Sequence, residues 1–89
     1  MNKKKILITG CAGFIGYHIS AKLCKENFNV IGIDNLNNYY DVNLKKDRVR
    51  ILNNKYKKNF TFYKIDINHK NLKKKLSRHK IHFIFHLAA

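Results

Sequence analysis

Three glycines near the start of the chain have the spacing of a phosphate-binding loop. They are Gly10, Gly13 and Gly16, in the segment GCAGFIG. We expect Gly10 to turn the chain sharply out of a strand, Gly13 to let the backbone approach phosphate oxygens, and Gly16 to let the following helix pack closely. A pyrophosphate would then face the N–H groups and the positive dipole end at the helix N-terminus. The spacing therefore predicts a dinucleotide site.

An acidic residue lies where such a site needs a carboxylate. Asp34 ends the segment 29–34 and follows Gly16 by 18 residues, near the spacing of about 20 expected for a ribose-binding acid. Its carboxylate would accept hydrogen bonds from the adenosine ribose and repel a 2′-phosphate, so the predicted cofactor is NAD rather than NADP. The alternative for Asp34 is a turn residue at a strand end.

Alternating strand and helix patterns would position these residues. Alternation of this kind is typical of an α/β fold with a parallel sheet. The strands read as near-continuous apolar runs, which indicates a sheet covered by helices on both faces. We expect a Rossmann-type sheet truncated to about four strands, in the order 3-2-1-4. The predicted strands are 5–9, 29–34, 60–66 and 81–87, and the predicted helices are 14–26, about 43–54 and about 69–79.

Two packing predictions follow from the apolar pattern. An apolar stripe at helical spacing should cover the sheet from the first helix. The last strand, 82–87, should form an apolar sheet edge without a neighbour on its outer side. The residues of the stripe are Phe14, Ile15, Ile19, Leu23 and Cys24.

The composition limits the choice of partners. The 89 residues form one domain at most, with a formal net charge of +14 that would ordinarily suggest nucleic acid. However, Lys, Asn and Ile supply 39 residues (16, 12 and 11), as expected from codons rich in A and T. The lysine runs 3–5 and 73–75 are interpreted as solvated surface. We therefore predict no specific nucleic-acid partner, and no membrane partner because no segment has about 18 apolar residues.

The two cysteines, Cys11 and Cys24, form no Cys-x-x-Cys pair, so neither a zinc site nor a disulfide framework is predicted. His82 and His86 would lie about 13 Å apart on a strand, too far for one metal, so no metal site is predicted. Cys11 should be a small core residue, although a helix N-terminus could instead lower its pKa. A cytoplasmic location fits the free thiols and the absence of a signal-peptide pattern.

Four segments of the chain together resemble a known family. These are 9–16, 32–37, 66–67 and 86–89, and they are similar to the extended short-chain dehydrogenase/reductase superfamily, specifically its NAD-dependent nucleotide-sugar epimerases and dehydratases. The resemblance covers the entire chain. A longer stretch, 34–48, looks like the loop and helix of the UDP-glucuronate 4-epimerase group.

The resemblance implies a role for each part of the cofactor site. Phe14 and Ile15 would contact the pyrophosphate through their backbone, and Asp66 and the Ile67 N–H would meet the adenine. Residues 35–38 would line the adenosine side, and residues 87–89 would run beneath the cofactor toward the nicotinamide ribose. The full set of implied cofactor residues is Gly10, Gly13, Phe14, Ile15, Gly16, Asp34, Asn35, Leu36, Asn37, Asn38, Asp66, Ile67, Leu87, Ala88 and Ala89.

The resemblance also implies a reaction whose catalytic groups these residues lack. Epimerases of this kind oxidise the sugar C4 hydroxyl with a Tyr-x-x-x-Lys pair, and none of the five tyrosines here has lysine four residues later. We therefore expect residues 1–89 to be the N-terminal part of an NAD-binding domain of a UDP-sugar 4-epimerase, without the substrate domain and without a catalytic residue. The complete enzyme would bind a UDP-sugar and could be a homodimer. His86 is expected to be a packed strand residue rather than a catalyst.

Three alternatives remain open at this point. The glycine loop and Asp34 also fit an NAD-dependent sugar-nucleotide dehydratase or reductase. The positive charge is compatible with a small basic binding fragment, whose binding to RNA would be salt-sensitive and independent of NAD. A gene remnant is a third possibility, since the predicted sheet has an open edge.

The missing Tyr-x-x-x-Lys pair gives a first testable prediction. Incubating this chain with NAD and UDP-glucuronate should yield no UDP-galacturonate, because no group is in place to take the proton from the C4 hydroxyl. Chromatography of the nucleotide sugars checks this. Product above that of a sample without protein would refute the prediction.

Overall fold

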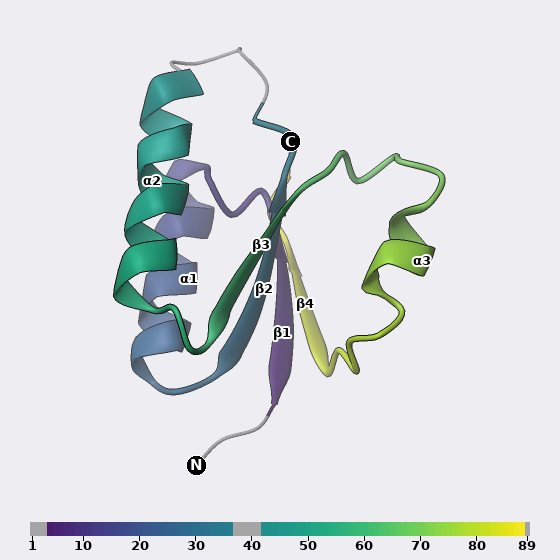
Figure 1. Ribbon diagram of the computed structural model, residues 1–89, viewed down its shortest axis with the longest axis horizontal. Coiled ribbons are helices and arrows are strands. Elements are labelled where there is room, and N and C mark those ends of the chain that lie inside the picture. The colour runs from purple at the N-terminus through teal and green to yellow at the C-terminus, as the bar shows by residue number, and fades with distance from the viewer. Residues whose placement is uncertain (1–3, 37–41, 89) are drawn as a thin grey trace.

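In the computed structural model, which describes residues 4–36 and 42–88, strands and helices alternate along the chain (Figure 1). The four strands are β1 (Lys5–Thr9), β2 (Asn29–Asp34), β3 (Phe60–Lys64) and β4 (Phe83–His86). The three helices are α1 (Phe14–Lys25), α2 (Val42–Lys55) and α3 (Leu72–Leu76).

The strands form one parallel sheet in the order β3-β2-β1-β4, which confirms the predicted order. Thr9 at the end of β1 is level with Ile33 of β2 on one side and with His86 of β4 on the other. The carboxyl ends of these three strands therefore meet at one edge of the sheet. Ligands of open α/β sheets bind at that edge.

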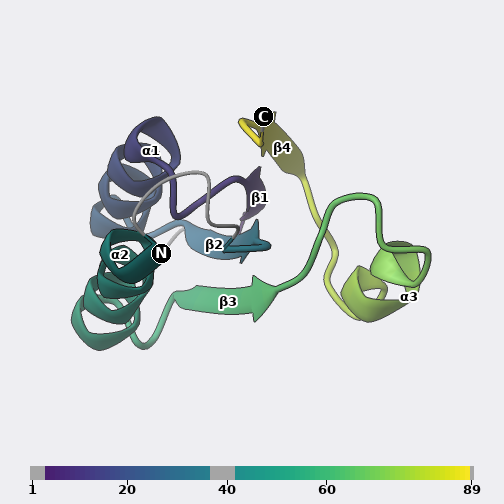
Figure 2. The ribbon, with the colours of Figure 1, turned by 90° about the horizontal axis from the view of Figure 1, so that it is seen from above.

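Helices cover both faces of the sheet, as predicted. Figure 2 shows α1 and α2 on one side and α3 on the other. Successive residues of a strand point to opposite faces, which explains why the central strands are apolar throughout. The core under α1 and α2 contains Ile6, Ile8, Cys11, Cys24, Val30, Leu52 and Phe60, and the core under α3 contains Leu7, Ile31, Ile33, Ile65 and Leu76.

The apolar stripe predicted for α1 is partly wrong. Phe14 and Ile15 are 66% and 60% exposed, and the residues that α1 buries are small: Gly16, Ser20 and Cys24. A Cβ atom at Gly16 would overlap the carbonyl oxygen of Gly10. Because α1 lies this close to the loop before it, only small side chains fit between the two. Ile19 and Leu23 are half-buried and pack against the core, as predicted.

The boundaries differ most after β3. The predicted strand 60–66 ends at Lys64, and the predicted helix 69–79 shortens to α3. Asp66 explains part of this difference, because its carboxylate accepts the Asn68 N–H at 2.7 Å and its carbonyl accepts the His69 N–H at 2.9 Å. These bonds close a turn where the helix was expected to begin. At the other end of the helix, the Ser77 hydroxyl donates to the carbonyl of Lys74, which lies in the last turn of α3.

The predicted apolar sheet edge is confirmed. Within the described residues β4 pairs with β1 alone, and all four of its residues are exposed. Phe83 and Ile84 are 52% and 61% exposed. In the part of the chain that the structure describes, this edge of the sheet therefore carries exposed apolar side chains.

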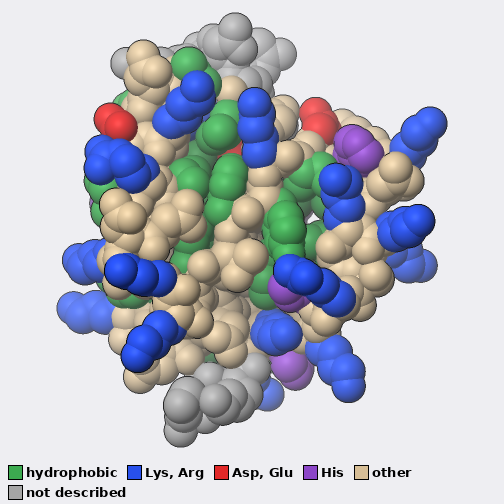
Figure 3. Space-filling model, in the orientation of Figure 1, with side chains coloured by type: hydrophobic (Ala, Val, Ile, Leu, Met, Phe, Trp, Pro, Cys, Tyr) green, Lys and Arg blue, Asp and Glu red, His purple; other side chains and the backbone are tan. Residues whose placement is uncertain are grey.

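The surface is rich in cations, as the composition requires. Lys73, Lys74 and Lys75 are all exposed, and Figure 3 shows lysine and arginine side chains spread over this face of the molecule with few acidic ones among them. Among residues 4–36 and 42–88, no helix is long and apolar enough to cross a membrane. In the same ranges no three His, Cys, Asp or Glu side chains gather as a metal site would require.

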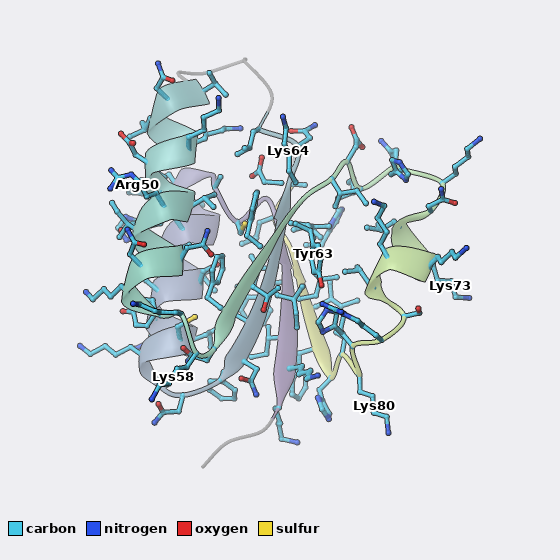
Figure 4. All side chains as sticks on the ribbon, viewed as in Figure 1. Arg50, Lys58, Tyr63, Lys64, Lys73 and Lys80 are labelled. Atoms are coloured by element: carbon cyan, nitrogen blue, oxygen red, sulfur yellow. The ribbon has the colours of Figure 1, made fainter. Side chains whose placement is uncertain are left out.

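A polar contact between Tyr63 and His79 fixes the segment after α3 to the sheet. Tyr63 points toward the α3 side (Figure 4), and its hydroxyl pairs with Nε2 of His79 at 2.9 Å. The Arg78 guanidinium donates to the same hydroxyl at 3.0 Å, which leaves the Tyr63 proton available to Nε2 of His79. Burial, followed by the charges of Lys5 and Arg78, lowers the pKa of His79 below 6.5.

Because the pKa of His79 is lower in the folded chain than in the unfolded chain, the unfolded chain takes up the proton first as the pH falls. Folding stability should therefore decrease as the pH falls through about 6.5 toward the folded pKa. Melting temperatures from circular dichroism at several pH values between 5 and 8 would measure this. The variant His79→Gln should flatten the pH dependence; an unchanged slope would contradict the assignment to His79.

Candidate functional site

A cleft of about 610 Å³ lies at the carboxyl ends of the strands. Of the sequence-predicted site residues that the structure describes, all but Leu36 line it. Asn37, Asn38 and Ala89 lie outside the described residues. The lining residues are Gly10, Gly13, Phe14, Ile15, Gly16, Asp34, Asn35, Leu44, Lys45, Arg48, Ile65, Asp66, Ile67, Asn68, Leu87 and Ala88.

The loop between β1 and α1 requires glycine at Gly10 for two reasons. Its φ of +74° lies in the left-handed region that side chains disfavour. A Cβ there would also lie 2.9 Å from the Ala88 nitrogen and the Leu87 carbonyl carbon. The sharp turn predicted for Gly10 is confirmed, and the close approach of the segment after β4 is an additional constraint.

The backbone N–H groups of this loop divide into two sets. Gly10 and Cys11 both donate to the Ile33 carbonyl, Ala12 donates to the Asp34 carboxylate, and Gly13 donates to the Gly10 carbonyl. These four N–H groups are therefore used within the protein. The next three, on residues 14–16 at the start of α1, donate to no other described residue. Residues 14–16 line the cleft, so these N–H groups at a helix N-terminus are available to an anion.

Asp34 combines the two roles considered for it. Asp34 is the last residue of β2 and is 7% exposed. Its Oδ2 atom accepts the Ala12 N–H at 3.1 Å. Oδ1 accepts the Leu36 N–H at 2.8 Å, which is the turn interaction expected at a strand end. Each carboxylate oxygen can accept a second hydrogen bond. The carboxylate can thus hold the loop and still receive a pair of hydroxyl groups from the cleft.

A second carboxylate, that of Asp66, also lines the cleft. Asp66, two residues after β3, accepts the Asn68 N–H at 2.7 Å and the Asn35 side-chain amide at 3.3 Å. These two bonds, the Asn68 N–H foremost, lower the pKa of Asp66. Asp66 is therefore an ionised acceptor at the cleft, next to Ile67.

The segment after β4 is fixed against the end of β1 by Thr9, whose backbone carbonyl accepts the Leu87 N–H at 3.1 Å. Oγ1 of Thr9 accepts the N–H groups of Leu87 and Ala88 at 2.9 and 3.2 Å. Its own proton is then available for Nδ1 of His86, 2.8 Å away. His86 is exposed on β4 rather than packed as predicted, because within the described residues nothing covers that edge. Its bond to Thr9 gives it a structural position at the edge of the cleft.

Neither cysteine has the environment of a reactive thiol. Cys11 is fully buried, and a Cβ added to Gly32 would lie 2.7 Å from its sulfur, so the thiol fills the space that this glycine leaves. Burial, and secondarily the charge of Asp34, raises the pKa of Cys11. The prediction of a small core residue is confirmed, and the alternative of a lowered pKa is wrong. Burial likewise raises the pKa of Cys24 to about 12.

Sequence reasoning missed the contribution of α2. Leu44, Lys45 and Arg48 share one face of this helix and line the cleft. Arg48 donates to the carbonyl of Ala12 at 3.0 Å, and its guanidinium lies 6.0 Å from the centre of the Phe14 ring. The signal in the sequence was the helical spacing of these residues shortly after Asp34. The partner, Ala12, could not be identified from that spacing.

Comparisons with known proteins agree on one family. The sequence profile of the family described as GDP-mannose 4,6 dehydratase matches residues 7–89. A UDP-glucuronate 4-epimerase from Thermodesulfobacterium geofontis is 48% identical over 84 residues, which are 93% of this chain and 25% of that protein. The chain spans about a quarter of the length of such curated relatives.

Solved structures show the same fold. A UDP-glucuronic acid 4-epimerase from Bacillus cereus, in complex with NAD, matches with a TM-score of 0.81 and 37% identity, over 96% of this chain and 27% of that one. A dTDP-glucose 4,6-dehydratase from Bacillus anthracis, also in complex with NAD, matches with a TM-score of 0.78 and 27% identity, over 97% of this chain and 27% of that one.

The bond between Asp34 and Ala12 should stabilise the fold without any ligand. In Asp34→Asn one carboxylate oxygen becomes an amide that faces an N–H donor, and the loss of that acceptor should cost about 1–3 kcal/mol in the free energy of unfolding. Urea denaturation would measure the loss. The control Asp47→Asn, which removes only an exposed pair with Arg50, should change stability by less than about 1 kcal/mol. Equal effects of the two variants would contradict the role assigned to Asp34.

Proposed function

This chain belongs to the NAD-dependent epimerase and dehydratase family of the extended short-chain dehydrogenase/reductases, and we propose that residues 1–89 form the NAD-binding part of a nucleotide-sugar 4-epimerase. The observation that carries the proposal is the division of N–H groups in the glycine loop. Four of them bind the protein itself, and the three at the start of α1, whose residues line the cleft, donate to no other described residue. That arrangement suits a diphosphate.

The cleft fits the rest of the cofactor as well. Asp34 offers one further acceptor site on each oxygen to the two hydroxyls of the adenosine ribose. The same charge would repel a 2′-phosphate, which supports NAD over NADP. Asp66, Ile67, Leu87 and Ala88 all line the cleft. In this proposal Asp66 and Ile67 meet the adenine, and Leu87 and Ala88 run beneath the cofactor toward the nicotinamide half.

The reaction proposed for the whole enzyme is the inversion of a UDP-sugar at C4. NAD supplies a hydride acceptor that oxidises the C4 hydroxyl and then returns the hydride to the opposite face. The residues described here bind and orient the cofactor: the start of α1 holds the diphosphate, Asp34 holds the ribose, and Thr9 fixes the segment after β4. No catalytic residue is assigned among residues 1–89, and binding of the UDP-sugar and assembly as a homodimer are proposed for the whole enzyme.

UDP-glucuronate is the substrate favoured by similarity. A UDP-glucuronate 4-epimerase is 48% identical to this chain, and a solved UDP-glucuronic acid 4-epimerase is 37% identical, whereas the dTDP-glucose 4,6-dehydratase is 27% identical. The second candidate is a sugar-nucleotide dehydratase or reductase, since the matching family profile carries a dehydratase description. The two free cysteines support a reducing compartment such as the cytoplasm.

Cofactor binding by this chain tests the proposal directly. Titration calorimetry should show NAD binding with a dissociation constant of roughly 1 mM, or about −4 kcal/mol, because residues 1–89 are proposed to form only part of the cofactor site. NADP should bind more weakly, since its 2′-phosphate would face Asp34. Equal affinity for NAD and NADP would contradict the role of Asp34, and the absence of NAD binding at 10-fold higher concentrations, roughly 10 mM, would contradict the proposal itself.

A further inference from the structure

Arg48 joins α2 to the glycine loop by a hydrogen bond. Its NH1 group donates to the Ala12 carbonyl at 3.0 Å, and its guanidinium lies over the Phe14 ring at 6.0 Å from the ring centre. The side chain is half-buried and lines the cleft. Arg48 therefore connects α2 to the residues immediately before the start of α1.

The bond from Arg48 completes the anchoring of one peptide unit. The Ala12 carbonyl and the Gly13 N–H belong to the same rigid peptide group. Arg48 holds the carbonyl end, and the Gly10 carbonyl accepts the N–H end at 3.1 Å. The preceding N–H, on Ala12, is held by Asp34. Two charged side chains from different elements therefore fix the backbone on both sides of Ala12.

The orientation of this peptide matters for an anion in the cleft. A carbonyl oxygen carries partial negative charge, and a diphosphate at the start of α1 would be repelled by one that turned toward it. Rotation of the peptide would also break the bond between Gly13 and Gly10. A guanidinium bound to the carbonyl opposes that rotation, because a charged donor makes a stronger hydrogen bond than water does.

We propose that Arg48 is a positioning residue for diphosphate binding: it holds the Ala12 carbonyl toward α2, so that the N–H groups at the start of α1 remain preorganised for the anion. The inference rests on the proposed function, since it assigns to Arg48 a role in the same site. The proposed role differs from a direct ionic contact with the phosphates, because Arg48 acts through the backbone of the loop.

Ligand binding gives the first test. Arg48→Met keeps the length of the side chain and removes both the charge and the donors. Calorimetry should show that the variant binds ADP about tenfold more weakly than the wild type, the scale of one charge-assisted hydrogen bond, with adenosine affinity unchanged. Arg48→Lys should recover part of the ADP affinity, and it replaces Arg48→Met in all measurements if the latter does not fold.

Arg50→Met is the matched control on the same helix. Arg50 is labelled in Figure 4, its side chain is 64% exposed, and it pairs with Asp47. Removing its charge changes the net charge of the protein equally but leaves the loop contacts intact. ADP affinity should stay at the wild-type value in this variant. An equal loss in both variants would show a general charge effect and would overturn the proposal.

Amide hydrogen exchange without ligand separates positioning from direct contact. In Arg48→Met the Ala12 and Gly13 amides should exchange about tenfold faster, while core amides such as Ile31 keep their wild-type rates. Weaker ADP binding with unchanged loop exchange would mean that Arg48 acts on the phosphates directly, which overturns the proposal. A third outcome is that the wild type binds neither NAD nor ADP, while loop amides still exchange faster in Arg48→Met. That result would support the contact between Arg48 and the loop but would refute the proposed function.

Discussion

The structure depends on the attachment of the loop after β1 to the end of β2. Gly10 and Cys11 share the Ile33 carbonyl, and Ala12 donates to the Asp34 carboxylate. Because a buried N–H group needs a partner, these bonds fix the path of the loop before any ligand is considered. They also determine where α1 begins, and thus which N–H groups are left without an internal partner. The N–H groups of residues 10–13 are all bonded within the protein, so the proposed diphosphate site is formed by the N–H groups that follow them.

Close packing of small residues makes this attachment possible. Cys11 occupies the space above Gly32, and Gly16 lies against the Gly10 carbonyl. Ser20 and Cys24 continue the same small-residue face of α1 toward the sheet. The helix α1 consequently lies close to the loop, and the positive end of its dipole is directed at the cleft. The larger residues Phe14 and Ile15 remain exposed beside the cleft, where Phe14 lies beneath Arg48.

The carboxylates show how one residue serves both fold and site. Asp34 is held by two backbone donors and Asp66 by a backbone donor and an amide, yet both line the cleft. Their structural bonds fix the direction in which their remaining lone pairs point. In a chain with 19 basic and 5 acidic residues, the position of two of the acids at one cleft is more informative than the net charge.

The order of strands and helices could be predicted from the amino-acid sequence, because the apolar runs and the glycine spacing are local signals with which the tertiary contacts agree. The sequence also placed Gly10, Asp34 and Asp66 at strand ends, so their meeting at one sheet edge followed from parallel topology. The face that α1 buries could be established only from tertiary contacts. Helical periodicity predicts that Phe14 is buried, and it takes no account of the Gly10 carbonyl that Gly16 must approach. Likewise, only the fold brought Arg48 to Ala12 across 36 positions of sequence, because a hydrogen bond between a helix and a distant loop leaves no periodic pattern.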